Sequence, residues 1–183
     1  MEIVVITGSG RKKGTSNYLV DEFVKGAIES GNKIYRFDCS DEKVKPCIGC
    51  GYCRKNSGCI YKDSFEKLIP HIISAQVVVF STPVYYMTMT SQLKAVIDRF
   101  YQLELMQGFK NNKKYVLLST AWDKRRNVFD TLDNTFESFC SFLKWSKYGM
   151  VLAPGMDKRE DIENSIYGKE AYKLGKSLLD IVI

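Results

Sequence analysis

Short apolar runs alternate with amphipathic stretches along the whole chain. Glu2–Thr7 is rich in β-branched residues and Gln76–Ser81 is continuously apolar, so each predicts a buried strand. The other predicted strands are Lys33–Phe37, Lys114–Thr120 and Lys147–Leu152, and the predicted helices are Ser16–Ser30, Ser64–Ile73, Ser91–Leu103, Val128–Phe142 and Lys169–Val182. Because crossovers between parallel strands are right-handed, this alternation predicts an α/β three-layer sandwich: a five-stranded parallel sheet with helices on both faces.

The chain length fits one domain. It has 183 residues, of which 45% are hydrophobic, and no Pro/Gly-rich linker divides it. We therefore expect a single domain over 1–183, with a cysteine-rich loop insertion at about 39–63. No apolar run is long enough to span a membrane and the first residues do not resemble a leader, so we expect a soluble, cytoplasmic protein without a membrane partner.

The net charge of +6 is spread over small basic groups separated by acidic residues. Such spacing does not form the long basic tract of a nucleic-acid binder, so we expect no nucleic-acid partner. A modest basic excess suits anionic small molecules.

In a parallel sheet, the loops at the carboxyl ends of the strands gather at one edge, where ligands bind. Function is therefore expected in the loops that follow the predicted strands, at 8–17, 39–63, 82–90 and 121–127. Two other charged or polar stretches, 111–112 and 157–163, are predicted to be solvated surface turns.

The first of these loops, Gly8–Asn17, has the composition of a phosphate site. Its glycines expose backbone N–H groups, its hydroxyls add donors, Arg11 adds charge, and a helix N-terminus follows. It lacks the residue order of a Walker loop and of the three-glycine dinucleotide fingerprint, which favours a phosphomonoester. The alternative is an ordinary glycine-rich turn with Thr15 or Ser16 as the helix N-cap.

The loop after the third predicted strand suits a planar ligand. Pro83 stiffens the exit from the strand, Tyr85 and Tyr86 offer flat faces, and exposed backbone amides could hydrogen-bond a heteroaromatic edge. Alternatively, these tyrosines belong to the core or to an interface.

Four cysteines fall within thirteen residues, with glycines between them. Cysteines at two-residue intervals can wrap an iron–sulfur cube, the occupant that we favour, with structural zinc and no metal as alternatives. Cys39 and Cys140 lie outside the spacing and are predicted to be buried thiols, and His71 is predicted to be structural. The proposed metal ligands are Cys47, Cys50, Cys53 and Cys59.

The phosphate loop, Ser81–Tyr86 and Lys94–Arg99 together resemble the flavodoxin-like NAD(P)H-dependent FMN reductase family, in particular its iron-sulfur flavoprotein branch. The resemblance covers about the first 120 residues and implies strand order 2-1-3-4-5. It also implies a homodimer or homotetramer, NAD(P)H or a ferredoxin-like donor, and a 4Fe-4S cluster in the cysteine loop. The implied FMN contacts are Ser9, Arg11, Thr15, Ser16 and Asn17 at the phosphate, Pro83, Val84, Tyr85 and Tyr86 at the ring, and Thr120, Ala121 and Trp122 on its other side.

The leading hypothesis is an FMN-dependent oxidoreductase that passes electrons to a further acceptor. No side chain is assigned as catalytic, because the cofactor carries the reaction. The cysteine loop is expected to open on the same sheet edge as the phosphate loop, where a cluster could pass electrons to FMN, either within one chain or across a subunit boundary. One alternative is a flavodoxin-type electron carrier, which the basic charge disfavours. Another is a zinc-knuckle nucleic-acid binder, which the strand and helix alternation disfavours.

Overall fold

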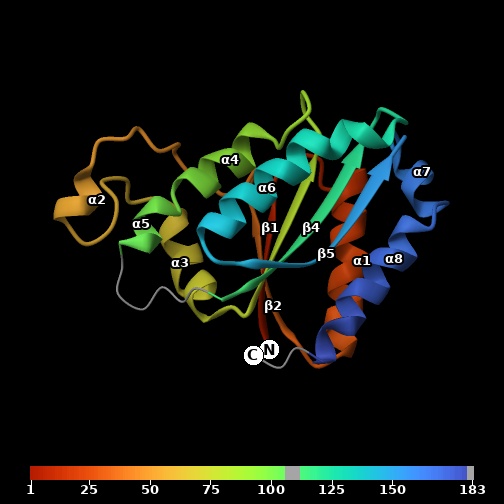
Figure 1. The fold of residues 1–183 in the computed structure, drawn as a ribbon, viewed down its shortest axis with the longest axis horizontal. Helices are drawn as coiled ribbons and strands as arrows, with labels where there is room; N and C mark the ends of the chain where they lie inside the picture. Colours follow the sequence, from red (N-terminus) through yellow and green to blue (C-terminus); the bar gives the residue numbers. More distant parts are fainter. Residues whose placement is uncertain (106–111, 181–183) are drawn as a thin grey trace.

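The computed structural model describes residues 1–105 and 112–180 and contains one parallel sheet (Figure 1). The strand order is β2-β1-β3-β4-β5, which confirms the predicted α/β class and topology. β1, β3 and β4 are almost completely buried, and most of their residues are apolar, because helices cover both faces of these strands. The strands are β1 Glu2–Thr7, β2 Lys33–Asp38, β3 Val77–Pro83, β4 Lys114–Ala121 and β5 Ser146–Pro154.

The helices pack in two layers, one on each face of the sheet (Figure 1). α3, α4 and α6 share a core with one face, and α1, α7 and α8 share a second core with the other. The short helix α2 lies apart from both layers, at the end of the molecule opposite α7. The helices are α1 Thr15–Glu29, α2 Tyr52–Lys55, α3 Phe65–Ser74, α4 Ser91–Asp98, α5 Tyr101–Glu104, α6 Asp130–Phe142, α7 Arg159–Glu163 and α8 Tyr167–Lys176, with 3-10 turns at Arg126–Phe129 and Ser177–Asp180.

Two glycines allow α1 and α8 to touch along their backbones. A Cβ atom on Gly26 would lie 2.1 Å from the carbonyl oxygen of Tyr172, and one on Gly175 would lie 2.1 Å from that of Phe23. Neither position has room for a side chain. This contact anchors α1, whose first residues belong to the predicted phosphate loop.

Three predicted segments differ from the structure. The helix predicted at Ser91–Leu103 breaks at Arg99 and Phe100 into α4 and α5. Residues 157–163 are not a solvated turn: they contain α7, which buries Ile162 against the α1 layer. The last helix starts at Tyr167, earlier than predicted, and is followed by a 3-10 turn at Ser177–Asp180; the predicted end of this helix, at Val182, lies outside the described residues.

The predicted turn at 111–112 lies partly outside the described residues, because residue 111 is among those not described. Within 1–105 and 112–180, no helix is both long and apolar enough to cross a membrane.

Candidate functional site

A cleft of about 480 Å³ lies at the edge of the sheet where the carboxyl ends of the strands meet. Loops after β1, β3, β4 and β5 build it, so residues far apart in sequence share one wall. Its lining consists of Ser9, Arg11, Lys13, Gly14, Thr15, Ser16, Pro83, Val84, Tyr85, Thr120, Trp122, Met156, Asp157, Lys158 and Arg159.

Most of the twelve predicted cofactor residues line this cleft. Three do not: Asn17 and Ala121 are buried, and Tyr86 points fully into solvent. The nine that line it are Ser9, Arg11, Thr15, Ser16, Pro83, Val84, Tyr85, Thr120 and Trp122.

The phosphate loop packs tightly against β3 and α4. The Gly8 N–H donates to the Ser81 carbonyl at 2.7 Å, and a Cβ on Gly8 would lie 2.5 Å from Thr90 Oγ1. At the other end of the loop, α1 has no side-chain N-cap and no acidic residue in its first turn. The alternative, an ordinary turn in which Thr15 or Ser16 is the N-cap of the helix, is therefore wrong, since the N-cap residue is Gly14. The first N–H groups of α1 remain for a ligand.

Asn17 shapes the loop from behind. Its amide nitrogen donates to the Arg11 carbonyl at 2.9 Å, and its oxygen accepts from Thr7 Oγ1 and Arg36, each at 3.1 Å. These bonds use its side chain within the protein. Asn17 thus holds the turn at Arg11 in place.

The loop after β3 forms a tight hairpin that projects from the molecule. Tyr85 and Thr88 pair across it, and the two residues at its tip, Tyr86 and Met87, have positive φ angles of 46° and 66°. The Val84 N–H donates to the Thr120 carbonyl at 2.8 Å and the Tyr85 N–H to the Thr88 carbonyl at 2.9 Å. The expectation of free amides in this loop is therefore wrong for these two residues.

Sequence reasoning missed the wall supplied by the loop after β5. The Gly155 N–H donates to the Asp123 carbonyl at 2.9 Å, and the Met156 N–H donates to the Ala121 carbonyl at 2.8 Å. These bonds draw Met156, Asp157, Lys158 and Arg159 beside Trp122. No sequence signal marked them, because a charged stretch usually means a solvated turn.

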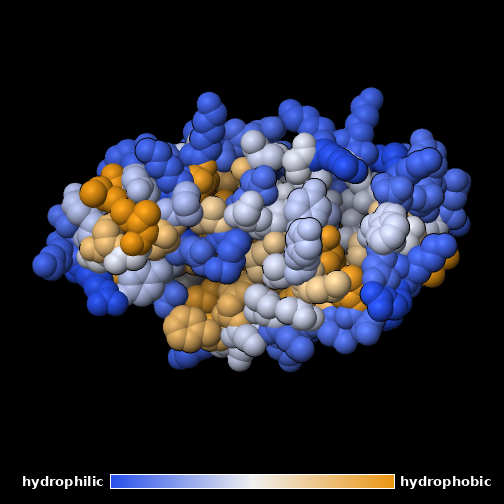
Figure 2. Space-filling view, turned by 90° about the horizontal axis from the view of Figure 1, so that it is seen from above, coloured by the Kyte–Doolittle hydropathy of each residue, from blue (hydrophilic) through white to orange (hydrophobic). Residues whose placement is uncertain are grey.

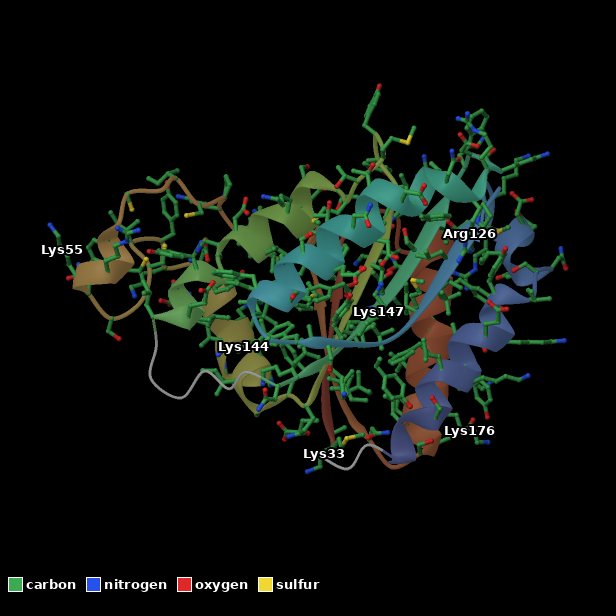
Figure 3. All side chains as sticks on the ribbon, in the orientation of Figure 1. Lys33, Lys55, Arg126, Lys144, Lys147 and Lys176 are labelled. Atoms are coloured by element: carbon green, nitrogen blue, oxygen red, sulfur yellow. The ribbon has the colours of Figure 1, made fainter. Side chains whose placement is uncertain are left out.

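The loop after β4 is held by local charge. Arg125 contacts both carboxylate oxygens of Asp123, and these hydrogen bonds lower the pKa of that carboxyl to about 2. Arg126 donates to the Leu152 carbonyl at 2.6 Å and ties the loop to β5 (Figure 3). Trp122 is 76% exposed but stands on a fixed backbone.

The four clustered cysteines line a second cavity, of about 210 Å³, that shares no residue with the cleft. We call residues 46–62 the cysteine lobe. None of its residues is buried, and Gly49, Gly51 and Gly58 adopt positive φ angles that let the backbone curl around the cavity. The lobe contains Cys47, Cys50, Cys53 and Cys59, all free thiols.

The lobe lies at the α2 end of the molecule, where Figure 2 shows exposed apolar atoms. Its approach begins beside the phosphate loop, since the Cys39 N–H donates to the Thr7 carbonyl at 2.8 Å and Ser40 Oγ to the Ser9 carbonyl at 3.3 Å. The chain then runs away from the cleft. The loop thus starts at the sheet edge that was predicted, but the two cavities share no lining residue in this chain.

In the part of the chain that the structure describes, no three His, Cys, Asp or Glu side chains are gathered closely enough to hold a metal ion. The lobe therefore brings the four cysteines to one cavity without closing them around a single point.

The remaining predictions concern residues outside these sites. Cys39 and Cys140 are buried as expected, and burial raises the pKa of both thiols. His71 stacks on Tyr35, with ring centroids 3.4 Å apart, in keeping with a structural role.

Comparison with known proteins gives several relatives. The chain is 29% identical to an iron-sulfur flavoprotein of Methanocaldococcus jannaschii, over 100% of this chain and 97% of that protein. It is 33% identical over 99 residues to an iron-sulfur flavoprotein of Archaeoglobus fulgidus, a match that covers 54% of this chain and spans only 45% of that relative. A third relative, an iron-sulfur flavoprotein of Methanosarcina thermophila, is 30% identical over 73% of this chain and 70% of its own length.

A similar solved structure is an NAD(P)H:quinone oxidoreductase from Methanothermobacter marburgensis. The TM-score is 0.79, with 15% identity over 99% of this chain and 97% of that one, so this likeness concerns the fold. The family model described as NADPH-dependent FMN reductase matches residues 1–145. That match covers most of the chain, including the sheet edge with its phosphate loop and hairpin, and the chain therefore belongs to the NADPH-dependent FMN reductase family.

Proposed function

We propose that the cleft binds FMN and that the protein is an FMN-dependent oxidoreductase, which takes electrons from NAD(P)H or a ferredoxin-like donor and passes them to an acceptor. One observation carries this proposal. A single cleft joins an uncapped helix N-terminus and hydroxyl groups at one end to Pro83, Val84, Tyr85 and Trp122 at the other. A phosphate attached to a flat ring system has this distribution of polar and apolar surface.

The phosphate end fits a phosphomonoester. Ser9, Thr15 and Ser16 provide hydroxyls, and the first turn of α1 provides N–H groups and the positive end of its dipole. Arg11 and Lys13 line the same end, and neither makes an ion pair within the described residues. Together these groups balance the charge of a phosphate.

The ring end fits an isoalloxazine. When bound, FMN supplies hydride and single-electron chemistry. Val84 and Tyr85 would support one side of the ring, and Thr120 and Trp122 would cover the other, where Trp122 would exclude water. Asn17 and Ala121 would act from behind the lining, and Tyr86 would stand over the rim.

We further propose that the cysteine lobe holds a 4Fe-4S cluster through Cys47, Cys50, Cys53 and Cys59. Four free thiols share one cavity, and three positive-φ glycines leave room for backbone N–H groups near sulfur. The spacing supports a cluster over zinc, because three of the cysteines follow one another at two-residue intervals, whereas structural zinc is usually held by two Cys-x-x-Cys pairs set further apart. The names of the iron-sulfur flavoproteins cited above support the same choice.

A cluster in the lobe would favour an acidic protein donor of the ferredoxin kind. The lobe carries Arg54, Lys55 and Lys62 and no acidic residue, and Lys55 stands at its outer end (Figure 3). Such a cluster persists in a reducing compartment such as the cytoplasm.

The separation of the two cavities favours a homo-oligomer. A second copy placed against the exposed Tyr86, Met87 and Trp122 would cover apolar surface and could bring its lobe to this cleft. Light scattering after size-exclusion chromatography should give a multiple of 21.0 kDa. A monomer would contradict this part of the proposal.

The main test is an FMN titration with two neighbouring basic residues compared. Arg11→Ala should weaken FMN binding by about 10- to 100-fold, because a charged hydrogen bond is worth about 1.5–3 kcal/mol. Lys12→Ala is the matched control: Lys12 lies in the same loop but pairs with Asp41 at 3.1 Å and does not line the cleft. Equal loss in both variants, or no FMN binding by the parent protein, would contradict the proposed site.

Turnover separates an enzyme from a flavodoxin-type carrier. Steady-state oxidation of NADH or NADPH, or of a reduced ferredoxin, should proceed with a quinone or flavin acceptor. Negligible turnover with every donor would leave the carrier as the better description. Iron and acid-labile sulfide in matched amounts in anaerobically purified protein would support the cluster.

A further inference from the structure

The two ends of the cysteine lobe meet at a narrow neck. The backbone N–H of Lys45 donates to Asp63 Oδ2 at 3.0 Å, which closes the intervening chain into a loop. Beyond the neck, the lobe has no buried residue. Its shape therefore depends on few contacts, and those at the neck are the most enclosed.

A single guanidinium fills this neck. Arg99, at the end of α4, is 2% exposed and donates to Asp63 Oδ2 at 2.9 Å, to the Lys45 carbonyl at 3.1 Å and to the Tyr61 carbonyl at 3.4 Å. It also lies over the rings of Tyr61 and Phe65. One side chain from a different element thus holds both ends of the lobe.

The same segment contacts the far part of the lobe. Tyr101, two residues after Arg99, accepts a hydrogen bond from Arg54 Nε at 2.7 Å, and the Arg54 guanidinium lies 5.6 Å from the centre of the Tyr101 ring. Arg54 belongs to α2, between Cys53 and Cys59. The junction between α4 and α5 therefore braces the lobe at its neck and at its helix.

A buried ion pair is a poor way to gain stability, because desolvation offsets the attraction between the charges. Its value lies in geometry: a planar guanidinium has donors in fixed directions and can bind several acceptors at once, which a lysine cannot reproduce. Here the acceptors belong to the two chain segments that lead into and out of the cysteine lobe. The contacts of Arg99 at the neck therefore fix how close these two segments lie to each other.

We propose that Arg99, paired with Asp63, is a positioning residue that holds the cysteine lobe in the arrangement needed to bind its cluster. This rests on the cluster assigned to the lobe under the proposed function. The hydrogen bonds that Arg99 makes to described residues go to Lys45, Tyr61 and Asp63 and to no cysteine, so it acts through the two ends of the lobe. The break between α4 and α5 places its guanidinium at the neck.

The test compares Arg99→Lys, Arg99→Met and Asp63→Asn with the parent protein after anaerobic cluster reconstitution. Cluster loss to an iron chelator should be about 10-fold faster in Asp63→Asn and Arg99→Met, with an altered electron paramagnetic resonance spectrum of the reduced cluster. The rate of cluster loss in Arg99→Lys should fall between these and the parent, because lysine keeps the positive charge but lacks the planar set of donors of the guanidinium. FMN affinity should stay within about twofold in all three.

Lys147→Met is the matched control. This substitution removes a partly buried ion pair in which Lys147 Nζ lies 2.7 Å from Asp133 Oδ1. The pair lies on the α6 side of the sheet, remote from the lobe (Figure 3). Its cluster should match that of the parent. Folded variants at the neck with the parent's cluster stability and spectrum would overturn the proposal.

Failure of the parent protein to take up a cluster would refute the cluster assignment. A second measurement then still tests whether the contacts at the neck hold the lobe in shape. Hydrogen exchange in metal-free protein should be about 10-fold faster across residues 46–62 in Asp63→Asn, with the cleft loops unchanged. Equal exchange in parent and variant would overturn the proposed role of the neck. If Arg99→Met fails to fold, Asp63→Asn and Arg99→Lys decide the matter.

Discussion

The cleft proposed to bind FMN and the cysteine lobe are built by different means. Four strand ends supply the walls of the cleft, and backbone hydrogen bonds join its loops to the sheet or to one another. The lobe leaves the fold after β2, contains one four-residue helix, and has no buried residue. A site at the edge of a sheet inherits its rigidity from the core, whereas the lobe depends on a neck and on whatever it binds.

The sharpest expected difference between regions concerns thiol reactivity. In metal-free protein at pH 8, the four lobe thiols should be alkylated much faster than Cys39 and Cys140, because these two are buried and thiolate is the reactive form. Burial raises the pKa of Cys39 to about 12. At pH 8 the thiolate of Cys39 is thus about one part in ten thousand. Mass spectrometry of peptides over a time course would measure each rate.

The pH dependence of the alkylation rate at Cys39 tests whether its raised pKa explains its low reactivity. The rate at Cys39 should rise about tenfold for each pH unit up to about 12, since its thiolate fraction does. The folded pKa lies above the ordinary value of 9.0, so the stability due to this thiol is complete below about pH 9 and is lost as the pH rises towards 12. Six thiols that react at one rate would contradict the contrast.

The next effect concerns the close packing behind the cleft. Gly8→Ala should weaken FMN binding by about tenfold or more and destabilise the protein by about 1–3 kcal/mol, because the new Cβ would lie 2.5 Å from Thr90 Oγ1 and 2.8 Å from Leu93 Cβ. Chemical denaturation and FMN titration measure the two losses. Cluster retention in the lobe should be unchanged.

Gly10→Ala is the control in the same loop. A Cβ at Gly10 meets nothing within 4 Å, and its φ is not positive, so FMN affinity and stability should stay near those of the parent. Similar losses in both variants would mean that the loop tolerates no side chain for some other reason.

The sheet and most of the cleft could be predicted from the sequence because both depend on local patterns. Apolar runs such as Val77–Phe80 mark strands wherever they lie, and parallel strands bring the loops that follow them to one edge. Glycine and hydroxyl residues before a helix mark an anion site by their own chemistry. Nine of the twelve predicted cofactor residues accordingly line one cleft.

What could not be predicted depends on contacts between distant residues. Met156 reaches the cleft through a bond to Ala121, and α7 forms where Ile162 is buried, neither of which the charged stretch at 157–163 reveals. The direction of the cysteine lobe is set by Arg99 and Asp63, which are 36 positions apart. The cysteine spacing could suggest what the lobe binds, but it could not show where the lobe lies in the fold.

The smallest expected effect belongs to the lobe itself. Gly51 has a φ of +70° just before α2, and a Cβ there would meet nothing within 4 Å, so Gly51→Ala adds strain without a clash. A left-handed conformation costs a residue with a side chain about 1–2 kcal/mol. Hydrogen exchange within the lobe should speed up by about five- to thirtyfold, which is that cost converted to a rate ratio, and cluster loss should quicken by a similar factor, with FMN affinity unchanged.

Gly31→Ala separates local from global strain. Gly31 has a φ of +76° and equally open surroundings, but it lies in the turn between α1 and β2, which the core holds. The same intrinsic cost there should appear as a lower free energy of unfolding for the whole protein, with lobe exchange as in the parent. If Gly51→Ala instead lowered global stability as much as Gly31→Ala and left the lobe's own exchange unchanged, the lobe would be part of the cooperative fold, and the contrast with the cleft would fail.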